Sequence, residues 1–99
     1  MSIQFEWDPA KDQSNQRKHG LGFVTALRVF ADPLAVSRQD RIEGGEGRWL
    51  TIGLVDGFLL VVVAHTVHVT GDSEVIRVIS ARRATRMERG AHENEKDRR

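Results

Sequence analysis

The sequence contains no cysteine, no tyrosine and only two prolines among its 99 residues. Without cysteine the chain can form no disulfide, zinc-thiolate site or thiol nucleophile, and we expect an intracellular, cytoplasmic protein. Long hydrophobic runs are also missing. The longest, Phe58 to Ala64, is far shorter than the roughly 20 apolar residues that a membrane helix needs. No signal peptide is visible at the N-terminus, so we expect no membrane partner.

The composition is that of a single compact domain spanning residues 1–99. Charged residues make up 29% and hydrophobic residues 39% of the chain, which is enough for one modest core. The net charge of +1 hides an uneven distribution, because five arginines stand against one acid, Glu88, between Arg77 and Arg89. Such a basic segment suits a polyanion or an acidic protein partner, although on a helix it equally suits a solvated face.

The stretch from Arg48 to Thr66 is the most hydrophobic in the chain and surrounds Asp56-Gly57. An Asp-Gly pair between apolar runs indicates a two-residue hairpin turn, because both turn residues need positive φ. In the register set by that turn, Arg48 faces His65. Both faces of the hairpin are apolar, so we expect it at the centre of a sheet with most of each face covered.

Two helices are predicted before this hairpin. The first begins at Asp8-Pro9 and ends at Gly20, and it has no apolar residue between Lys11 and His19. The second is amphipathic, with Phe23, Ala26, Leu27 and Phe30 recurring at helical spacing. We expect the second helix to cover the hairpin face made by Leu50, Ile52, Leu54, Val61 and Val63.

The other segments complete an α+β fold. Before the hairpin we expect a first strand in which Ile3, Phe5 and Trp7 alternate with polar residues, a short strand at 34–36 and a mobile polar loop at 37–47. After the hairpin we expect a turn at 70–73, a strand at 74–81, and a helix from Arg86 capped by Thr85. Residues 90–99 read as a frayed tail. The expected architecture is an antiparallel sheet with two N-terminal helices packed on one face and a C-terminal helix.

Seven separated motifs point to a known family. They are FEWDPAK at 5–11, N-x-x-KHG at 15–20, F-x-x-A at 23–26, F-x-DPLA at 30–35, RWLTIG at 48–53, LLVVVAHT at 59–66 and IRVISARRAT at 76–85. In this order they resemble the BrnT-type toxins of bacterial type II toxin-antitoxin systems over nearly the whole chain. Two positions depart from the expected pattern: Gly22 replaces a capping Ser or Thr, and His68 with its neighbours replaces an acidic-basic pair.

The resemblance implies a RelE-like fold and an endoribonuclease that blocks translation. It also implies inhibition by a BrnA-type antitoxin that carries a ribbon-helix-helix domain. Through that antitoxin the pair would contact operator DNA and repress its own operon. The alternative is a non-catalytic binding module that acts only through the antitoxin and operon autoregulation.

The residues themselves offer the parts for RNA cleavage without a metal or other cofactor. Histidine suits the two proton transfers, and arginine suits the charge that grows on the phosphorane. The catalytic candidates are Arg77, His65, Arg82, Arg83, Lys18 and His19, and the RNA-binding candidates are Arg48, Trp49 and Arg86. Metal binding is not expected, because His65 and His68 should project from opposite faces of one strand.

Arg77 ranks first among these candidates. Its strand should pair with the second strand of the hairpin, so Arg77 and His65 are expected to face a common surface. Arg82 and Arg83 should point to opposite sides of their strand.

Each of the other candidates also has a plain structural explanation. His65 could be a hydrogen-bonded structural residue, and Lys18 with His19 could favour a helix dipole. The Arg82, Arg83 and Arg86 series could dock an acidic antitoxin segment, and Trp49 could serve either the core or base stacking.

Overall fold

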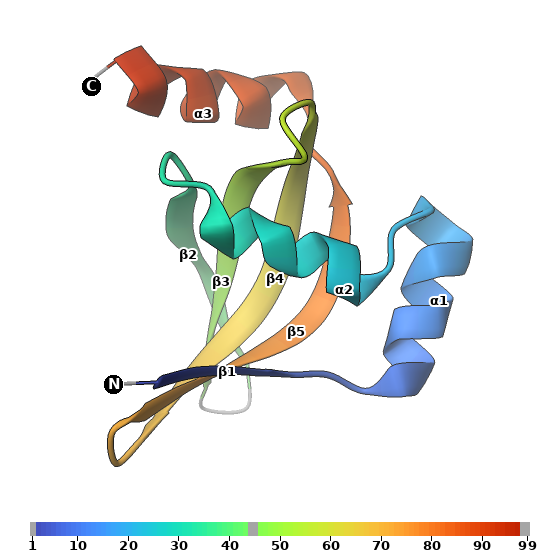
Figure 1. The fold of residues 1–99 in the computed structure, drawn as a ribbon, viewed down its shortest axis with the longest axis vertical. Coiled ribbons are helices and arrows are strands. Elements are labelled where there is room, and N and C mark those ends of the chain that lie inside the picture. Colours follow the sequence, from blue (N-terminus) through green and yellow to red (C-terminus); the bar gives the residue numbers. More distant parts are fainter. Residues whose placement is uncertain (1, 44–45, 98–99) are drawn as a thin grey trace.

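A computed structural model of the chain describes residues 2–43 and 46–97. Five strands form one sheet in the order β1-β5-β4-β3-β2 (Figure 1). The strands are β1 (Ser2–Glu6), β2 (Val36–Glu43), β3 (Glu46–Val55), β4 (Leu59–Thr70) and β5 (Ser73–Arg83). The helices are α1 (Pro9–His19), α2 (Phe23–Ala26), which continues into the 3-10 helix η1 (Leu27–Ala31), and α3 (Arg86–Asp97). Within the described ranges, no helix is long and apolar enough to cross a membrane.

The hairpin of β3 and β4 forms around Asp56-Gly57 as predicted, but its register is shifted by one residue. Both turn residues have positive φ, 54° and 84°. Phe58 joins them in the turn and is 77% exposed, so Val55 pairs with Leu59. The turn thus contains three residues, Asp56, Gly57 and Phe58, where the sequence predicted two. The predicted two-residue register is therefore wrong.

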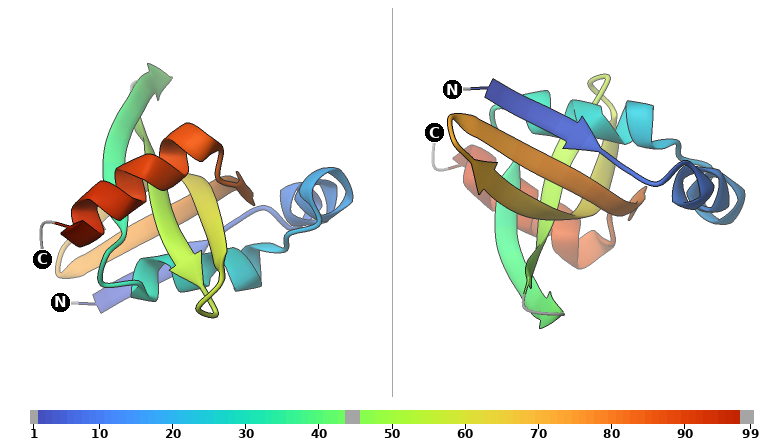
Figure 2. Two further views of the ribbon diagram at one scale, coloured as in Figure 1. Left: turned by 90° about the horizontal axis from the view of Figure 1, so that it is seen from above. Right: turned by 90° about the horizontal axis from the view of Figure 1, so that it is seen from below.

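This shift moves the β4 side chains to the opposite face relative to β3, because side chains alternate with period two. The predicted pairing of Arg48 with His65 is wrong: Arg48 pairs with Thr66, and His65 pairs with Trp49. Figure 2 shows α2 and α3 on opposite sides of the sheet. We call these sides the α2 face and the α3 face.

Each face has its own hydrophobic cluster. On the α2 face the buried residues are Leu21, Phe23, Ala26, Val29, Val55, Val61, Val63, Val78 and Ala81. On the α3 face the cluster is smaller and is formed by Ile52, Leu60 and Val62 with Leu50, Leu54 and Ala84. The predicted helix does cover the sheet, but Leu50, Ile52 and Leu54 lie under α3 instead. The side-chain-free Gly53 lets η1 approach closely, since a Cβ there would lie 2.8 Å from the Val29 carbonyl oxygen.

Helix α1 stands beside the edge of the sheet (Figure 1), so the prediction that both N-terminal helices pack on one face is wrong. Its limits match the prediction, with Asp8 as N-cap and Gly20 as a left-handed C-cap at φ 68°. Because α1 offers almost no apolar surface, it is held by the buried Asn15. The Asn15 amide donates to the carbonyl of Ala81 at 2.8 Å and accepts from the Ala81 N–H at 3.1 Å. Asn15 thus pairs with β5 beyond the point where β1 ends.

Asn15→Ala is expected to lower the free energy of unfolding by about 2–4 kcal/mol. The change removes the Ala81 bonds and a third bond, to the Leu21 carbonyl, and leaves buried backbone groups unpaired. Urea unfolding followed by circular dichroism measures the loss. Gln13→Ala, an exposed change on the same helix, is the control and should cost little. Equal costs for the two variants would show that α1 is not anchored through Asn15.

Three further predictions need correction at the edges and the end of the fold. The sheet is mixed, not purely antiparallel, because β1 runs parallel to β5 with Phe5 opposite Ile76. The polar loop predicted at 37–47 is largely strand: β2 pairs with β3 from Val36 to Glu43, and residues 44–45 lie outside the described chain. Charged residues are common on such an edge strand, which hides it from hydrophobic patterning. The tail predicted to fray from residue 90 is helical through Asp97.

Candidate nucleic-acid interface

One cross-strand row of the α3 face aligns three arginines, two of which, Arg48 and Arg77, are candidates named from the sequence. The Cα partners run in the order Arg41, Arg48, Thr66, Arg77 and Glu6 across all five strands. Directly opposed residues project from one face. With neighbouring strands about 4.8 Å apart, the three arginines span roughly 15 Å. We call Arg41, Arg48 and Arg77 the arginine row.

Small residues next to this row give the arginines a shallow floor. Thr66 lies within the row, and Ala64 and Ser80 are paired in the next row toward α3. Thr66 and Ala64 are almost fully buried, whereas the Arg77 side chain is 46% exposed. Long cationic side chains around a floor of small residues form a surface suited to an extended polyanion.

The first turn of α3 closes one end of this surface. The Glu88 carboxylate accepts two hydrogen bonds from Arg82, at 2.7 and 2.8 Å, and lies 4.0 Å from Arg38. Thr85 caps the helix as predicted, because its hydroxyl accepts from the Glu88 N–H at 3.2 Å while Glu88 accepts from the Thr85 N–H at 2.9 Å. The Arg82 hydrogen bonds are the largest influence that lowers the pKa of Glu88 to about 2. Arg82 is therefore held by α3.

Glu88→Gln should destabilise the protein by about 2 kcal/mol at pH 7, a value reduced from the full pKa shift because Arg82 is 38% exposed. The folded-state pKa lies below the ordinary value of 4.5. The stabilisation is therefore complete above that value and is lost as the pH falls toward 2. Unfolding curves from pH 7 to pH 2 should show the two proteins converging. Glu93→Gln on the same helix is the control, and a constant gap at all pH values would refute the assignment.

Lys18 and His19 lie in the last turn of α1, beside β5. They line a hollow of about 180 Å³ together with Lys11, Ser14, Asn15, Ile79 and Ser80. Ser80 is three residues beyond Arg77 along β5, roughly 10 Å at strand rise. The hollow thus gathers basic side chains of α1 at the part of β5 that follows Arg77.

His65 lies elsewhere, so the expectation that it shares a surface with Arg77 is wrong. Arg77 pairs with Thr66, the next residue along β4, and neighbouring strand residues point to opposite faces. His65 is 4% exposed on the α2 face, where its Nε2 lies 2.7 Å from the Thr51 hydroxyl and its ring meets Phe30 edge-on. Burial lowers the pKa of His65. These contacts fit the structural explanation offered for this histidine.

The remaining candidates divide between the faces. Trp49 pairs with His65 and Arg83 pairs with Val61, so both belong to the α2 face, while Arg82 pairs with Val62 on the α3 face. Arg82 and Arg83 therefore point to opposite sides, as predicted. Arg86 is exposed at the first residue of α3.

The sequence reading missed Arg38, Arg41 and Glu6. The two arginines fell in the predicted loop. A register shift in the pairing of β2 with β3, between Gln39 and Arg41, also interrupts the alternation of side chains between the two faces of β2. Glu6 stood between two apolar strand residues, Phe5 and Trp7, and that alternation was the available signal that it faces away from the α2 core.

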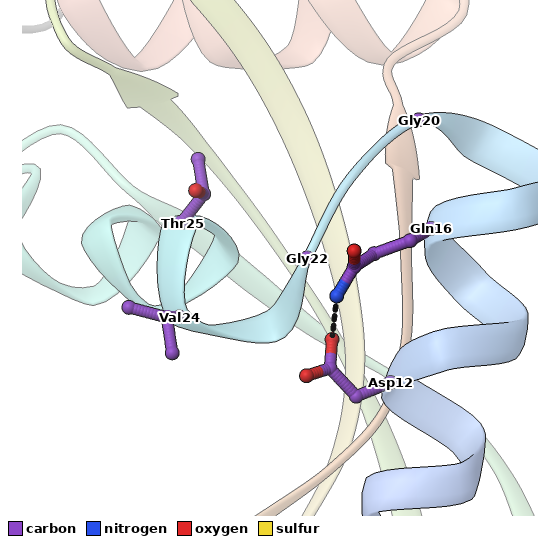
Figure 3. A pocket seen from close by; sticks show the side chains of 6 residues that line it. All are labelled: Asp12, Gln16, Gly20, Gly22, Val24 and Thr25. Atoms are coloured by element: carbon purple, nitrogen blue, oxygen red, sulfur yellow. Dashed lines mark hydrogen bonds between the residues drawn. The ribbon is translucent and has the colours of Figure 1, made fainter.

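A second hollow, of about 390 Å³, lies between α1 and α2 (Figure 3). Its lining includes Asp12 and Gln16 but no cationic side chain. Asp12 accepts hydrogen bonds from Gln16 at 3.2 Å and from the Phe23 N–H at 2.8 Å. It thereby caps α2, where Gly22 supplies no side-chain cap. This hollow serves the helix junction and does not extend the basic surface.

Two observations describe the site as a whole. In the described part of the chain, no group of three or more His, Cys, Asp or Glu side chains is placed to hold a metal ion. The fold and the arginine row together define an α+β protein with an open basic sheet face, a class suited to polyanions.

The comparisons with known proteins agree with this class. A family model described as "Ribonuclease toxin, BrnT, of type II toxin-antitoxin system" matches residues 7–88. The chain therefore belongs to the BrnT family of ribonuclease toxins. It is similar to the 1.1 Å crystal structure of the Brucella abortus ribonuclease toxin BrnT, with 28% identity and a TM-score of 0.58 over 87% of this chain and 99% of that chain. The search of curated proteins gave no match.

Proposed function

We propose that this toxin is a metal-independent endoribonuclease with a RelE-like fold that cleaves RNA on its α3 face and so inhibits translation. The observation that carries the proposal is the arginine row, which aligns Arg41, Arg48 and Arg77 on one open face. Membership of a ribonuclease toxin family supports the activity.

The roles of the basic residues follow from their positions. A guanidinium binds two phosphate oxygens at once and keeps its charge, so it favours the phosphorane over the ground-state diester. Arg77 lies between the floor residue Thr66 and the edge strand β1, and we assign it to the scissile phosphate. Arg41 and Arg48 would hold neighbouring phosphates, and Lys18 and His19 would border the site from α1.

A BrnA-type ribbon-helix-helix antitoxin would neutralise the toxin by covering the same face and would carry the complex to operator DNA. Carboxylate and phosphate fit the same guanidinium fork. Glu88 of α3 already shows a carboxylate seated on this face, against Arg82. We therefore expect an acidic antitoxin segment to compete with RNA for the arginine row.

The test is cleavage of labelled RNA by purified toxin from which the antitoxin has been removed by denaturation and refolding. The assay contains a chelator and is run with and without ribosomes. We expect discrete cleavage products in at least one condition and their loss when the antitoxin is added back. RNA left intact in both conditions, by a toxin that still binds its antitoxin, would instead favour the non-catalytic binding module.

A further inference from the structure

Glu6 occupies a position on the α3 face to which no role has so far been given. It is the last residue of β1 and the direct partner of Arg77. Its Oε1 lies 3.7 Å from the nearer Arg77 nitrogen, and both side chains are about half exposed, at 50% and 46%. The carboxylate is therefore open to solvent and adjacent to the guanidinium assigned to the scissile phosphate.

We propose that Glu6 is the general base of RNA cleavage, an inference that rests on the proposed ribonuclease function. The carboxylate takes the proton of the ribose 2′-hydroxyl, and the 2′-oxygen attacks the phosphorus. The bond from phosphorus to the 5′-oxygen breaks, leaving a 2′,3′-cyclic phosphate. The departing 5′-oxygen takes a proton from water, and protonated Glu6 returns its proton to the resulting hydroxide.

The surroundings of Glu6 suit a general base better than the surroundings of Arg77, His65 or Glu88 do. A carboxylate beside Arg77 can accept a proton near the phosphate that Arg77 holds, whereas arginine itself never loses its proton. His65 lies buried on the opposite face. Glu88 already accepts hydrogen bonds from Arg82 and from the Thr85 N–H. Glu6 combines exposure, a basic oxygen and direct pairing with the central arginine.

Single-turnover cleavage by Glu6→Gln tests the assignment. At neutral pH we expect the rate to fall by about 10²- to 10³-fold, and the acidic limb of the pH–rate profile should disappear. Binding of a fully 2′-O-methylated RNA of the same sequence should change by less than about threefold, because Glu6 contributes chemistry and not affinity. Glu6→Asp keeps a carboxylate, so it should retain the acidic limb at an intermediate rate. Wild-type products should end in a 2′,3′-cyclic phosphate.

The control is Glu74→Gln, which removes the same charge near the start of β5. Glu74 pairs with Val69 and Ile3 and so lies on the α2 face. The cleavage rate of the Glu74→Gln variant should match that of the wild-type toxin. A wild-type rate in Glu6→Gln overturns the proposal. A parallel loss of RNA binding and rate with an unchanged pH profile also overturns it, since Glu6 would then only position Arg77. If the wild-type toxin leaves RNA intact, the proposed ribonuclease function fails together with the role of Glu6. If only the role of Glu6 is wrong, the wild-type toxin still cleaves RNA, so the two failures can be told apart.

Discussion

Arg77→Ala should reduce the single-turnover rate of RNA cleavage by about 10²- to 10³-fold, the loss typical of removing one preorganised donor to a developing charge. The side chain is 46% exposed, so its removal should leave the free energy of unfolding nearly unchanged. Rapid-quench cleavage assays at saturating toxin, together with urea unfolding, separate the two effects. Arg77→Lys keeps the charge but loses the two-pronged contact and should give an intermediate rate.

Arg28→Ala is the matched control for this experiment. Arg28 forms an ion pair with Asp56 at the hairpin turn, and η1 places it on the α2 side of the sheet. The variant removes the same charge from the opposite side, and we expect wild-type cleavage. An Arg77→Ala toxin that cleaves at the wild-type rate would show that the α3 face is not the site.

Asp32→Ala should lower the free energy of unfolding by about 3–5 kcal/mol, the cost of breaking a buried, hydrogen-bonded ionic group. Asp32 accepts the N–H groups of Leu34 and Leu54 at 2.9 and 2.7 Å. It also meets His92 of α3 at 2.8 Å, and both side chains are 8% exposed. Burial raises the pKa of Asp32, but the bonds from Leu54, Leu34 and His92 outweigh it and leave the pKa lowered.

The measurement for Asp32 is a denaturant titration with two comparisons. Asp40→Ala changes an exposed aspartate of β2 and should cost less than about 0.5 kcal/mol. A double-mutant cycle with His92→Ala isolates the contact that joins the η1 end to α3. A loss of less than about 1 kcal/mol in Asp32→Ala would show that this contact does not hold α3 in place.

Local signals in the sequence predicted much of the fold. Asp8 and Gly20 marked the ends of α1, Thr85 marked the start of α3, and Asp56-Gly57 marked the central turn. Each of these depends on backbone groups within a few residues, which the chain itself displays. The pairing of the Arg77 strand with β4 was also correct, because a short turn joins the two.

The errors arose at one residue of the hairpin turn and at places where contacts distant in sequence decide the structure. Phe58 joined the hairpin turn, and that single residue moved every following side chain of β4 to the other face. The site changed accordingly: His65 moved into the core, and Thr66 took its place opposite Arg77. The polar edge strand β2 and the attachment of α1 through Asn15 likewise depend on partners distant in sequence, which periodicity does not reveal.

The most direct test of the account is the salt dependence of binding to a 2′-O-methylated RNA. Each phosphate contact contributes about 0.7 to the slope of log affinity against log salt for a single strand. The Arg41→Ala, Arg48→Ala, Arg77→Ala triple variant should therefore lose a slope of about 2, while Arg28→Ala keeps the wild-type slope. An unchanged slope in the triple variant, with RNA still bound, would place the RNA elsewhere on the protein and contradict the account.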